Sequence, residues 1–145
     1  MAELYRSAHQ CIEYYPEHSM IKRVLSGIAE NANWPAFQVE CLEYASIVRV
    51  YKPQYILSDA RKFQIIMLKE MQDWVNDNLI NVFNEIMLQK CAIIIPPQFL
   101  HQLGIEQTIE ANPDNAFEVQ YFENEEDAIE WLKSGKKYQV YKLEL

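Results

Sequence analysis

The sequence contains few of the features by which whole classes of protein are recognised. Only three of its 145 residues are Gly, which excludes the Gly-rich loops that wrap phosphate groups. No apolar run approaches the ~20 residues that a helix needs to cross a bilayer, so we expect no membrane insertion. The N-terminal segment "MAELYRSAHQ" carries charges but no apolar signal core, and we therefore expect a cytoplasmic protein.

Cysteine is also scarce. Cys11, Cys41 and Cys91 are widely spaced and form no CxxC pair, so we expect buried, reduced thiols rather than a disulfide framework. His9 and Cys11 are spaced like two metal ligands on one strand face, but zinc sites normally show more ligands than this. The GxSxG, HExxH, P-loop and dinucleotide-binding patterns are all missing. We therefore expect no metal, no cofactor and no enzymatic activity.

Basic residues are absent from a long stretch near the C-terminus. The formal net charge is −8 at pH 7, and residues 102–132 contain nine acids but no Lys or Arg. Such a surface repels phosphate backbones, so we expect no nucleic-acid partner. We favour a solubilising role for these acids; the alternative is a docking surface for a basic partner. The residues that would form this docking surface are Glu123, Glu125, Glu126, Asp127 and Glu130.

The N-terminal half shows a readable succession of strand and helix patterns. Three short strands are predicted in "AELYRSA", "QCIEYY" and "SMIKRVLSG", and "PEH" supplies the turn of a hairpin between the last two. A helix is predicted next, with Asn33 as its cap. Its apolar stripe is Phe37, Cys41, Ala45 and Val48, and Pro53 stops it.

The C-terminal half continues this alternation. "QYILSD" reads as a short strand, residues 68–88 as a long helix, and "KCAIIIPP" as a strand buried on both faces. Residues 98–112 are predicted to be a loop or short helix, "AFEVQYF" a strand, and Asn124 the cap of a last helix that ends at Gly135. "KYQVYKLEL" is either a final strand or a docked tail. The pattern predicts one α/β domain over residues 1–145, with a mixed sheet, an N-terminal antiparallel hairpin and helices packed on it.

Three short motifs carry a resemblance to a known family. They are "YILSDARKF" at a strand end, "EMQDWVNDNL" in the following helix and "YFENEEDAIEWL" near the C-terminus. The chain resembles the STAS-like (SpoIIAA-like) proteins of bacteria, which have the anti-sigma-factor-antagonist fold, over about residues 9–134. The resemblance implies a STAS-like sandwich, with residues 136–145 as a tail or extra strand, and a regulatory module that binds another protein.

Antagonist-type STAS domains carry a phosphorylatable Ser or Thr just after the Asp that ends a central strand. The matching stretch here is "SDARKFQII", in which no Ser or Thr follows Asp59, and Ser58 precedes it on the strand. The family's Gly after the phosphosite is absent as well. We therefore expect a STAS-like module that lacks the usual phosphoswitch.

Asp59 and Arg61 lie where a central strand is predicted to end, the edge at which open α/β sheets favour ligands. In the functional interpretation, Asp59, Arg61 and Lys62, with Pro96 and Pro97 on the next loop, line a site in which Arg61 offers a forked donor to an anion. In the structural interpretation, which we favour, Asp59 caps loop amides and Arg61 is paired locally or solvated.

These observations predict a non-enzymatic STAS-like protein-interaction or regulatory module. The alternative is a carrier or sensor domain that binds a small apolar or anionic ligand in a cleft at the strand ends. A third hypothesis is a homodimer formed through an unpaired edge strand.

Overall fold

The computed structural model describes residues 1–26, 34–62, 68–96 and 117–134. Within these residues the chain forms one mixed sheet whose six strands follow one another in sequence order across the sheet. The strands are β1 (Ala2–Arg6), β2 (Gln10–Tyr15), β3 (Met20–Leu25), β4 (Tyr55–Asp59), β5 (Lys90–Ile94) and β6 (Glu118–Phe122). The predicted α/β class with a mixed sheet is confirmed.

The N-terminal strands pair antiparallel, as the sequence predicts. β1 pairs with β2 and β2 with β3. The "PEH" turn is the single 3₁₀ turn η1 (Pro16–His18). Ser19 follows it in the left-handed conformation, with a φ of 49°, and it returns the chain into β3.

The remaining pairings are parallel: β3 pairs with β4, β4 with β5, and β5 with β6. One cross-strand row contains Ile21, Ile56, Cys91 and Val119. It faces the larger apolar cluster of the core. The alternate residues of β4 and β5, such as Leu57 and Ala92, face a second cluster. The sheet therefore has a buried apolar layer on both faces, as expected for parallel strands.

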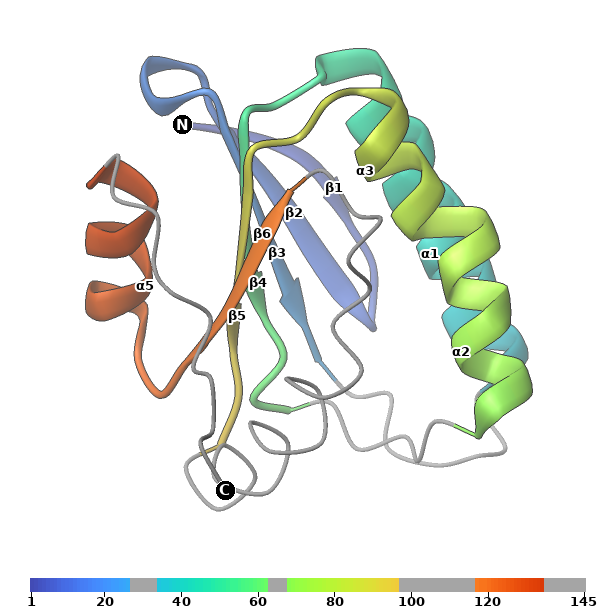
Figure 1. Ribbon diagram of the computed structural model, residues 1–145. Helices are drawn as coiled ribbons and strands as arrows, with labels where there is room; N and C mark the ends of the chain where they lie inside the picture. The colour runs from blue at the N-terminus through green and yellow to red at the C-terminus, as the bar shows by residue number, and fades with distance from the viewer. Residues whose placement is uncertain (27–33, 63–67, 97–116, 135–145) are drawn as a thin grey trace.

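Helices cover the two faces of the sheet unequally (Figure 1). α1 (Trp34–Tyr51) and α2 (Lys69–Val75) with α3 (Asn81–Glu85) lie on one face, and α5 (Glu125–Lys133) covers the other (Figure 1). The predicted stripe of α1 is buried: Phe37, Cys41, Ala45 and Val48 are each at most 4% exposed. None of the described helices is long and apolar enough to cross a membrane.

The predicted helix over residues 68–88 is confirmed with one irregularity. α2 and α3 are joined by a π-helical turn, η3 (Asn76–Ile80). A π turn widens the helix and disturbs its regular backbone hydrogen bonds. The side-chain amide of Asn78 donates to the carbonyl oxygen of Trp74 at 2.8 Å, so a side chain helps to satisfy the backbone at the turn.

The predicted cap of the last helix is confirmed. The backbone N–H of Asp127 donates to Oδ1 of Asn124 at 2.9 Å, and Nδ2 of Asn124 donates to Oδ2 of Asp127 at 3.2 Å. Ala128, Trp131 and Leu132 form the buried side of α5. The expectations for Asn33, Pro97, Gly135 and residues 98–112 and 136–145 fall outside the described residues.

Candidate functional site at the carboxyl edge of the sheet

Asp59 ends β4 and forms a closed local pair with Arg61. Nε of Arg61 donates to Oδ1 of Asp59 at 3.0 Å and Nη2 donates to Oδ2 at 2.7 Å. The Arg61 backbone N–H also donates to Oδ1, at 3.2 Å. Both carboxylate oxygens are therefore occupied by one residue. This is the local pairing and capping that the structural interpretation of the motif describes.

The protonation of this pair follows from its geometry. Partial burial raises the pKa of Asp59, but hydrogen bonds from the Arg61 side chain and backbone and the Arg61 charge outweigh it, so the net pKa is lowered. The same hydrogen bond raises the pKa of Arg61. The side chain of Asp59 is 13% exposed and that of Arg61 47%. Asp59 is thus held as a carboxylate and is poorly suited to accept a proton in a reaction.

A second ion pair lies at the same edge. Nζ of Lys22, on β3, is 2.6 Å from Oε1 of Glu125, at the start of α5. Burial lowers the pKa of Lys22, but the hydrogen bond and charge of Glu125 dominate, and the pKa is raised. The Lys22 charge also lowers the pKa of Asp59, and the Glu125 charge raises that of Arg61. Two acids and two bases therefore compensate one another at this edge.

The other predicted binding residues contribute less to this arrangement. Lys62 is exposed and Pro96, which follows β5, is half-buried, while Pro97 lies outside the described residues. The structure thus places the Asp59–Arg61 pair near the Lys22–Glu125 pair, close enough for the charges of the two pairs to interact. Sequence reasoning missed Lys22, because the strand alternation places it on a face but does not show which helix residue lies opposite.

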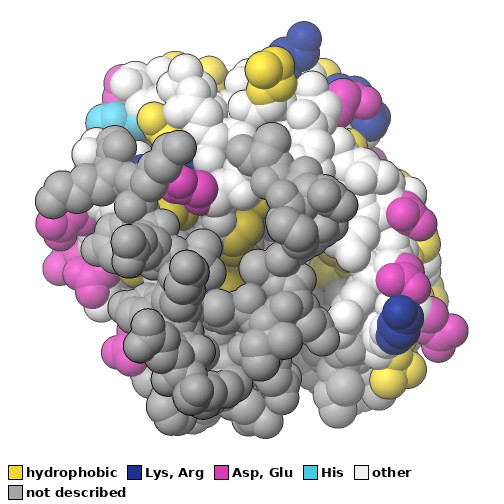
Figure 2. Space-filling view, in the orientation of Figure 1, with side chains coloured by type: hydrophobic (Ala, Val, Ile, Leu, Met, Phe, Trp, Pro, Cys, Tyr) yellow, Lys and Arg dark blue, Asp and Glu magenta, His cyan; other side chains and the backbone are white. Residues whose placement is uncertain are grey.

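The acids predicted to form a docking surface gather around the start of α5. Glu123, Glu126, Asp127 and Glu130 are exposed, and Glu125 is half-buried in its pair with Lys22. Figure 2 shows acidic side chains along the flank where Figure 1 places α5. Asp127 is occupied by the helix cap. Glu123, Glu126 and Glu130 make no ion pair with a described Lys or Arg, so their charge remains available to a partner.

The opposite face of the sheet holds a buried polar cluster that sequence reasoning did not select. Arg23 is 4% exposed and Gln10 is 1% exposed. Nε of Arg23 donates to Oε1 of Gln10 at 2.7 Å, and Nη2 donates to Sγ of Cys41 at 3.7 Å. The guanidinium also lies over the ring of Tyr44, 4.3 Å from its centroid. Arg23 makes no ion pair with a carboxylate among the described residues, so neutral acceptors and an aromatic face hold its charge.

This cluster continues to a buried carboxylate. Nε2 of Gln10 donates to the backbone oxygen of Glu40 at 2.9 Å. The Glu40 carboxylate accepts from the hydroxyls of Ser7, at 3.0 Å, and Tyr5, at 3.4 Å. Burial raises the pKa of the Cys41 thiol despite the nearby Arg23, so Cys41 is a poor nucleophile. The sequence signal for this cluster was Arg23 itself, a charged residue that shares one strand face with the apolar residues Ile21 and Leu25.

No hydroxyl occupies the place at which the resemblance puts a phosphosite. Ser58 is still on β4, one residue before Asp59, and it is half-buried beside Arg23 in the sheet register. Ala60, Arg61 and Lys62 follow directly. A phosphoryl group on Ser58 would enter the interior layer of the fold instead of the exposed start of a helix, where backbone N–H groups favour anions.

Two cavities of the described part of the chain lie away from this edge. One, of about 330 Å³, lies at the opposite edge of the parallel strands, next to η1. The other, of about 350 Å³, lies between α1 and the π turn. Neither is lined by Asp59, Arg61 or Lys62. Within the described residues, no three His, Cys, Asp or Glu side chains gather in a way that would hold a metal ion.

The open edge of β1 bears on the predicted homodimer. Among the described strands, β1 and β6 are at the two edges of the sheet. The β1–β2 register shifts between Glu3 and Tyr5, and Glu3 pairs with Arg6 at 2.6 Å. Irregular register and charged side chains are devices that discourage strand addition. The homodimer remains a prediction for a solution measurement.

Comparisons of the chain with known proteins found no relative. No protein-family model, no curated protein and no solved structure matches the chain. The fold and the site define the chain as an α/β domain with a mixed six-stranded sheet. Two ion pairs neutralise the charges at the carboxyl edge of its strands.

Proposed function

We propose that this protein is a non-enzymatic STAS-like interaction module that binds a basic protein through the exposed acids at the start of α5. The resemblance carried by the three motifs supports a STAS-like fold, and the alternation of strands and helices along the chain agrees with it. In this role the protein acts as a cytoplasmic, bacterial regulator without the usual phosphoswitch.

One observation carries the proposal: charges cancel at the strand edge but not on α5. Asp59, Arg61, Lys22 and Glu125 form two ion pairs. The neighbouring Glu123, Glu126 and Glu130 are exposed and make no ion pair with a described Lys or Arg. Exposed charges of one sign speed encounter with an oppositely charged partner and select against wrong ones. A basic protein therefore fits this flank better than an acidic or nucleic-acid partner.

The arrangement at the end of β4 disfavours a reaction centre there. The carboxylate of Asp59 is occupied by Arg61 and has a lowered pKa. No hydroxyl follows it before the end of the described stretch at Lys62. A module that acts by binding needs neither a free base nor a phosphoacceptor at this place.

A capture experiment with matched variants tests the proposal. The tagged protein is incubated with lysate of its own organism at low and moderate salt. The first variant neutralises the docking acids (Glu123→Gln, Glu126→Gln, Glu130→Gln). The control makes the same change of charge on the helices of the other face (Glu43→Gln, Glu70→Gln, Asp73→Asn). We expect a stoichiometric basic partner with the wild type and the control, weakened by salt, and its loss with the first variant.

Two results would overturn this function. One is the absence of any stoichiometric partner at both salt concentrations. The other is a partner retained equally by both variants, which would place the interface elsewhere. Purification of the partner and a direct titration against both variants then gives the change in affinity.

A further inference from the structure

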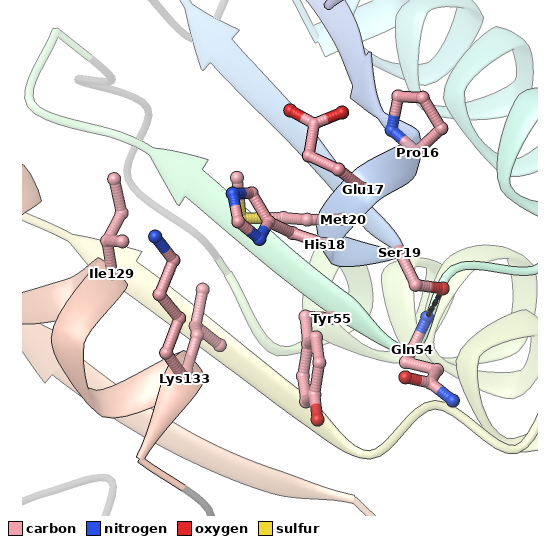
Figure 3. A pocket seen from close by; sticks show the side chains of 10 residues that line it. Pro16, Glu17, His18, Ser19, Met20, Gln54, Tyr55, Ile129 and Lys133 are labelled. Atoms are coloured by element: carbon pink, nitrogen blue, oxygen red, sulfur yellow. Dashed lines mark hydrogen bonds between the residues drawn. The ribbon is translucent and has the colours of Figure 1, made fainter.

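The cavity at the amino edge of the parallel strands is built from three separate elements. η1 and Ser19 form one wall, the first residues of β3 and β4 form the floor, and the last turn of α5 forms the second wall (Figure 3). Its volume is about 330 Å³, at the small end of the ~300–1,000 Å³ that is usual for ligand sites. We call it the amino-edge pocket, to distinguish it from the edge that carries Asp59.

The first wall is fixed to the sheet by backbone hydrogen bonds. The Ser19 carbonyl oxygen accepts from the backbone N–H of Gln54 at 2.9 Å and of Tyr55 at 3.1 Å. The Ser19 hydroxyl accepts from the Gln54 N–H at 3.2 Å (Figure 3). The N–H of Ser19 itself donates to Pro16 at 3.2 Å. The pocket is therefore preformed, and a ligand need not order this turn when it binds.

The base of the pocket is apolar. Met20 is 5% exposed and Leu132 is 2% exposed, and both line it. Ile129 and the ring of Tyr55 are half-buried beside them. A short hydrocarbon or small aromatic group placed here would lose water from its surface, which is the main favourable contribution to binding an apolar body.

The opening of the pocket holds one ammonium group, that of Lys133, opposite the imidazole of His18. The Lys133 side chain extends from α5 toward the ring of His18, whereas the Glu17 carboxylate points away from both (Figure 3). Lys133 and His18 are exposed and make no ion pair with another described residue. A helix C-terminus would normally repel an anion, since its free carbonyls carry partial negative charge. Here the Trp131 carbonyl accepts from Nζ of Lys90 at 3.0 Å and from the Ser134 hydroxyl at 2.8 Å, which offsets that repulsion.

We propose that the amino-edge pocket binds a small amphiphilic anion, of the class of short-chain monocarboxylates. The carboxylate lies between the Lys133 ammonium and the His18 imidazole, and the apolar body lies on Met20, Leu132 and the Tyr55 ring. The Lys133 ammonium selects the charge, and the apolar base and the small volume select a short chain. This site is separate from the docking surface of α5 and goes beyond the proposed protein-binding function.

Titration with hexanoate, followed by two-dimensional amide NMR spectra, tests the proposal. Hexan-1-ol and hexylamine serve as controls of equal chain length. We expect hexanoate to shift the amide signals of residues 17–20, 54–55 and 129–133 in a saturable manner. Both controls should bind at least about tenfold more weakly, because they lack a charge-assisted hydrogen bond to Lys133.

Four variants make the test specific. Lys133→Gln should weaken hexanoate about tenfold, whereas Lys69→Gln, an equal change at an exposed site of α2, should have no effect. Lys133→Glu should reverse the preference toward hexylamine. Ile129→Trp should fill the pocket and abolish binding. Because Lys133 is exposed, these Lys variants are expected to fold normally, and an unchanged spectrum away from the pocket checks this.

The proposal is overturned if hexanoate produces no saturable shifts, if it binds no better than hexan-1-ol, or if Lys133→Gln and Lys69→Gln behave alike. None of these outcomes decides the capture experiment, which replaces Glu123, Glu126 and Glu130 and leaves Lys133 unchanged.

Discussion

Replacing Gln10 with Leu should lower the free energy of unfolding by about 2.5–4 kcal/mol. The substitution removes the oxygen that accepts from Nε of Arg23 at 2.7 Å, and hydrogen bonds to charged groups contribute ~1.5–3 kcal/mol. It also leaves the Glu40 backbone oxygen without its 2.9 Å donor, a neutral bond of ~1 kcal/mol. Arg cannot relieve this by deprotonation, so its charge stays in the core with only Cys41 and Tyr44 beside it.

The double variant identifies the cause of that loss. Arg23→Met keeps much of the side-chain length but removes the charge, and with it the cost of an inadequately solvated cation. Added to Gln10→Leu, it should therefore recover about 2 kcal/mol relative to Gln10→Leu alone, because only the Glu40 backbone bond then remains unmade. The two substitutions are expected to be strongly non-additive.

Urea denaturation followed by circular dichroism measures all four proteins of this cycle. Arg49→Met is the control, since Arg49 is exposed and its ion pair with Glu85 at 2.9 Å is worth at most ~1 kcal/mol. A loss below about 1 kcal/mol for Gln10→Leu, or additive single effects, would refute the reasoning. Either result would mean that water, not Gln10, solvates Arg23 in the folded protein.

Three further predictions concern other parts of the fold. Because the pKa of Asp59 is lowered in the folded state, its ionised form contributes stability above the ordinary value of 3.8. Asp59→Asn should therefore cost about 1 kcal/mol near neutral pH, and thermal melts should show this cost shrinking as the pH falls below 3.8. Asn124→Ala removes the cap of α5 and should cost about 1 kcal/mol in a urea titration, whereas Asn124→Asp should be nearly neutral. Burial raises the pKa of Cys91 to about 12, so a thiol reagent should label the half-exposed Cys11 before Cys91 in native protein.

Each of these has a result that contradicts it. A cost of Asp59→Asn that is the same at all pH values would show that the charge of the carboxylate is not what stabilises the turn. Equal stability of Asn124→Ala and wild type would show that the cap is not formed in solution. Equal labelling rates for Cys11 and Cys91 before unfolding would show that β5 is not buried as described.

The order of strands and helices is readable from the sequence because each element has its own apolar period. "KCAIIIPP" is continuously apolar, and β5 is indeed covered on both faces. The stripe of α1 and the cap at Asn124 are equally local signals. The π turn at Asn76–Ile80 has no such signal in the local pattern of apolar residues. Leu79 within the turn and Val82 after it are both buried, so the pattern of apolar residues still reads as a regular helix.

The residues of the candidate sites were harder to predict, because they meet only through the register of the sheet. Asp59 and Arg61 are two residues apart, and their pairing was foreseen as one of two interpretations. Lys22 and Glu125 are far apart in the chain and meet only because α5, which packs on β4, β5 and β6, begins within reach of the Lys22 side chain. The amino-edge pocket depends in the same way on three strand and helix ends that no local motif marks.

The placement of charge along α5 has a structural explanation that must be separated from its proposed function. Acids at a helix N-terminus and a lysine at its C-terminus each stabilise the helix by ~0.3–1 kcal/mol through its dipole, and α5 has both. If that were their only role, neutralising Glu126 would lower stability without changing partner affinity, and Lys133→Gln would do the same without changing hexanoate binding. The two proposals predict the opposite partition: affinity falls about tenfold or more, whereas the free energy of unfolding changes by less than about 1 kcal/mol per residue. Measuring both quantities on the same variants therefore decides whether these charges serve the helix or its ligands.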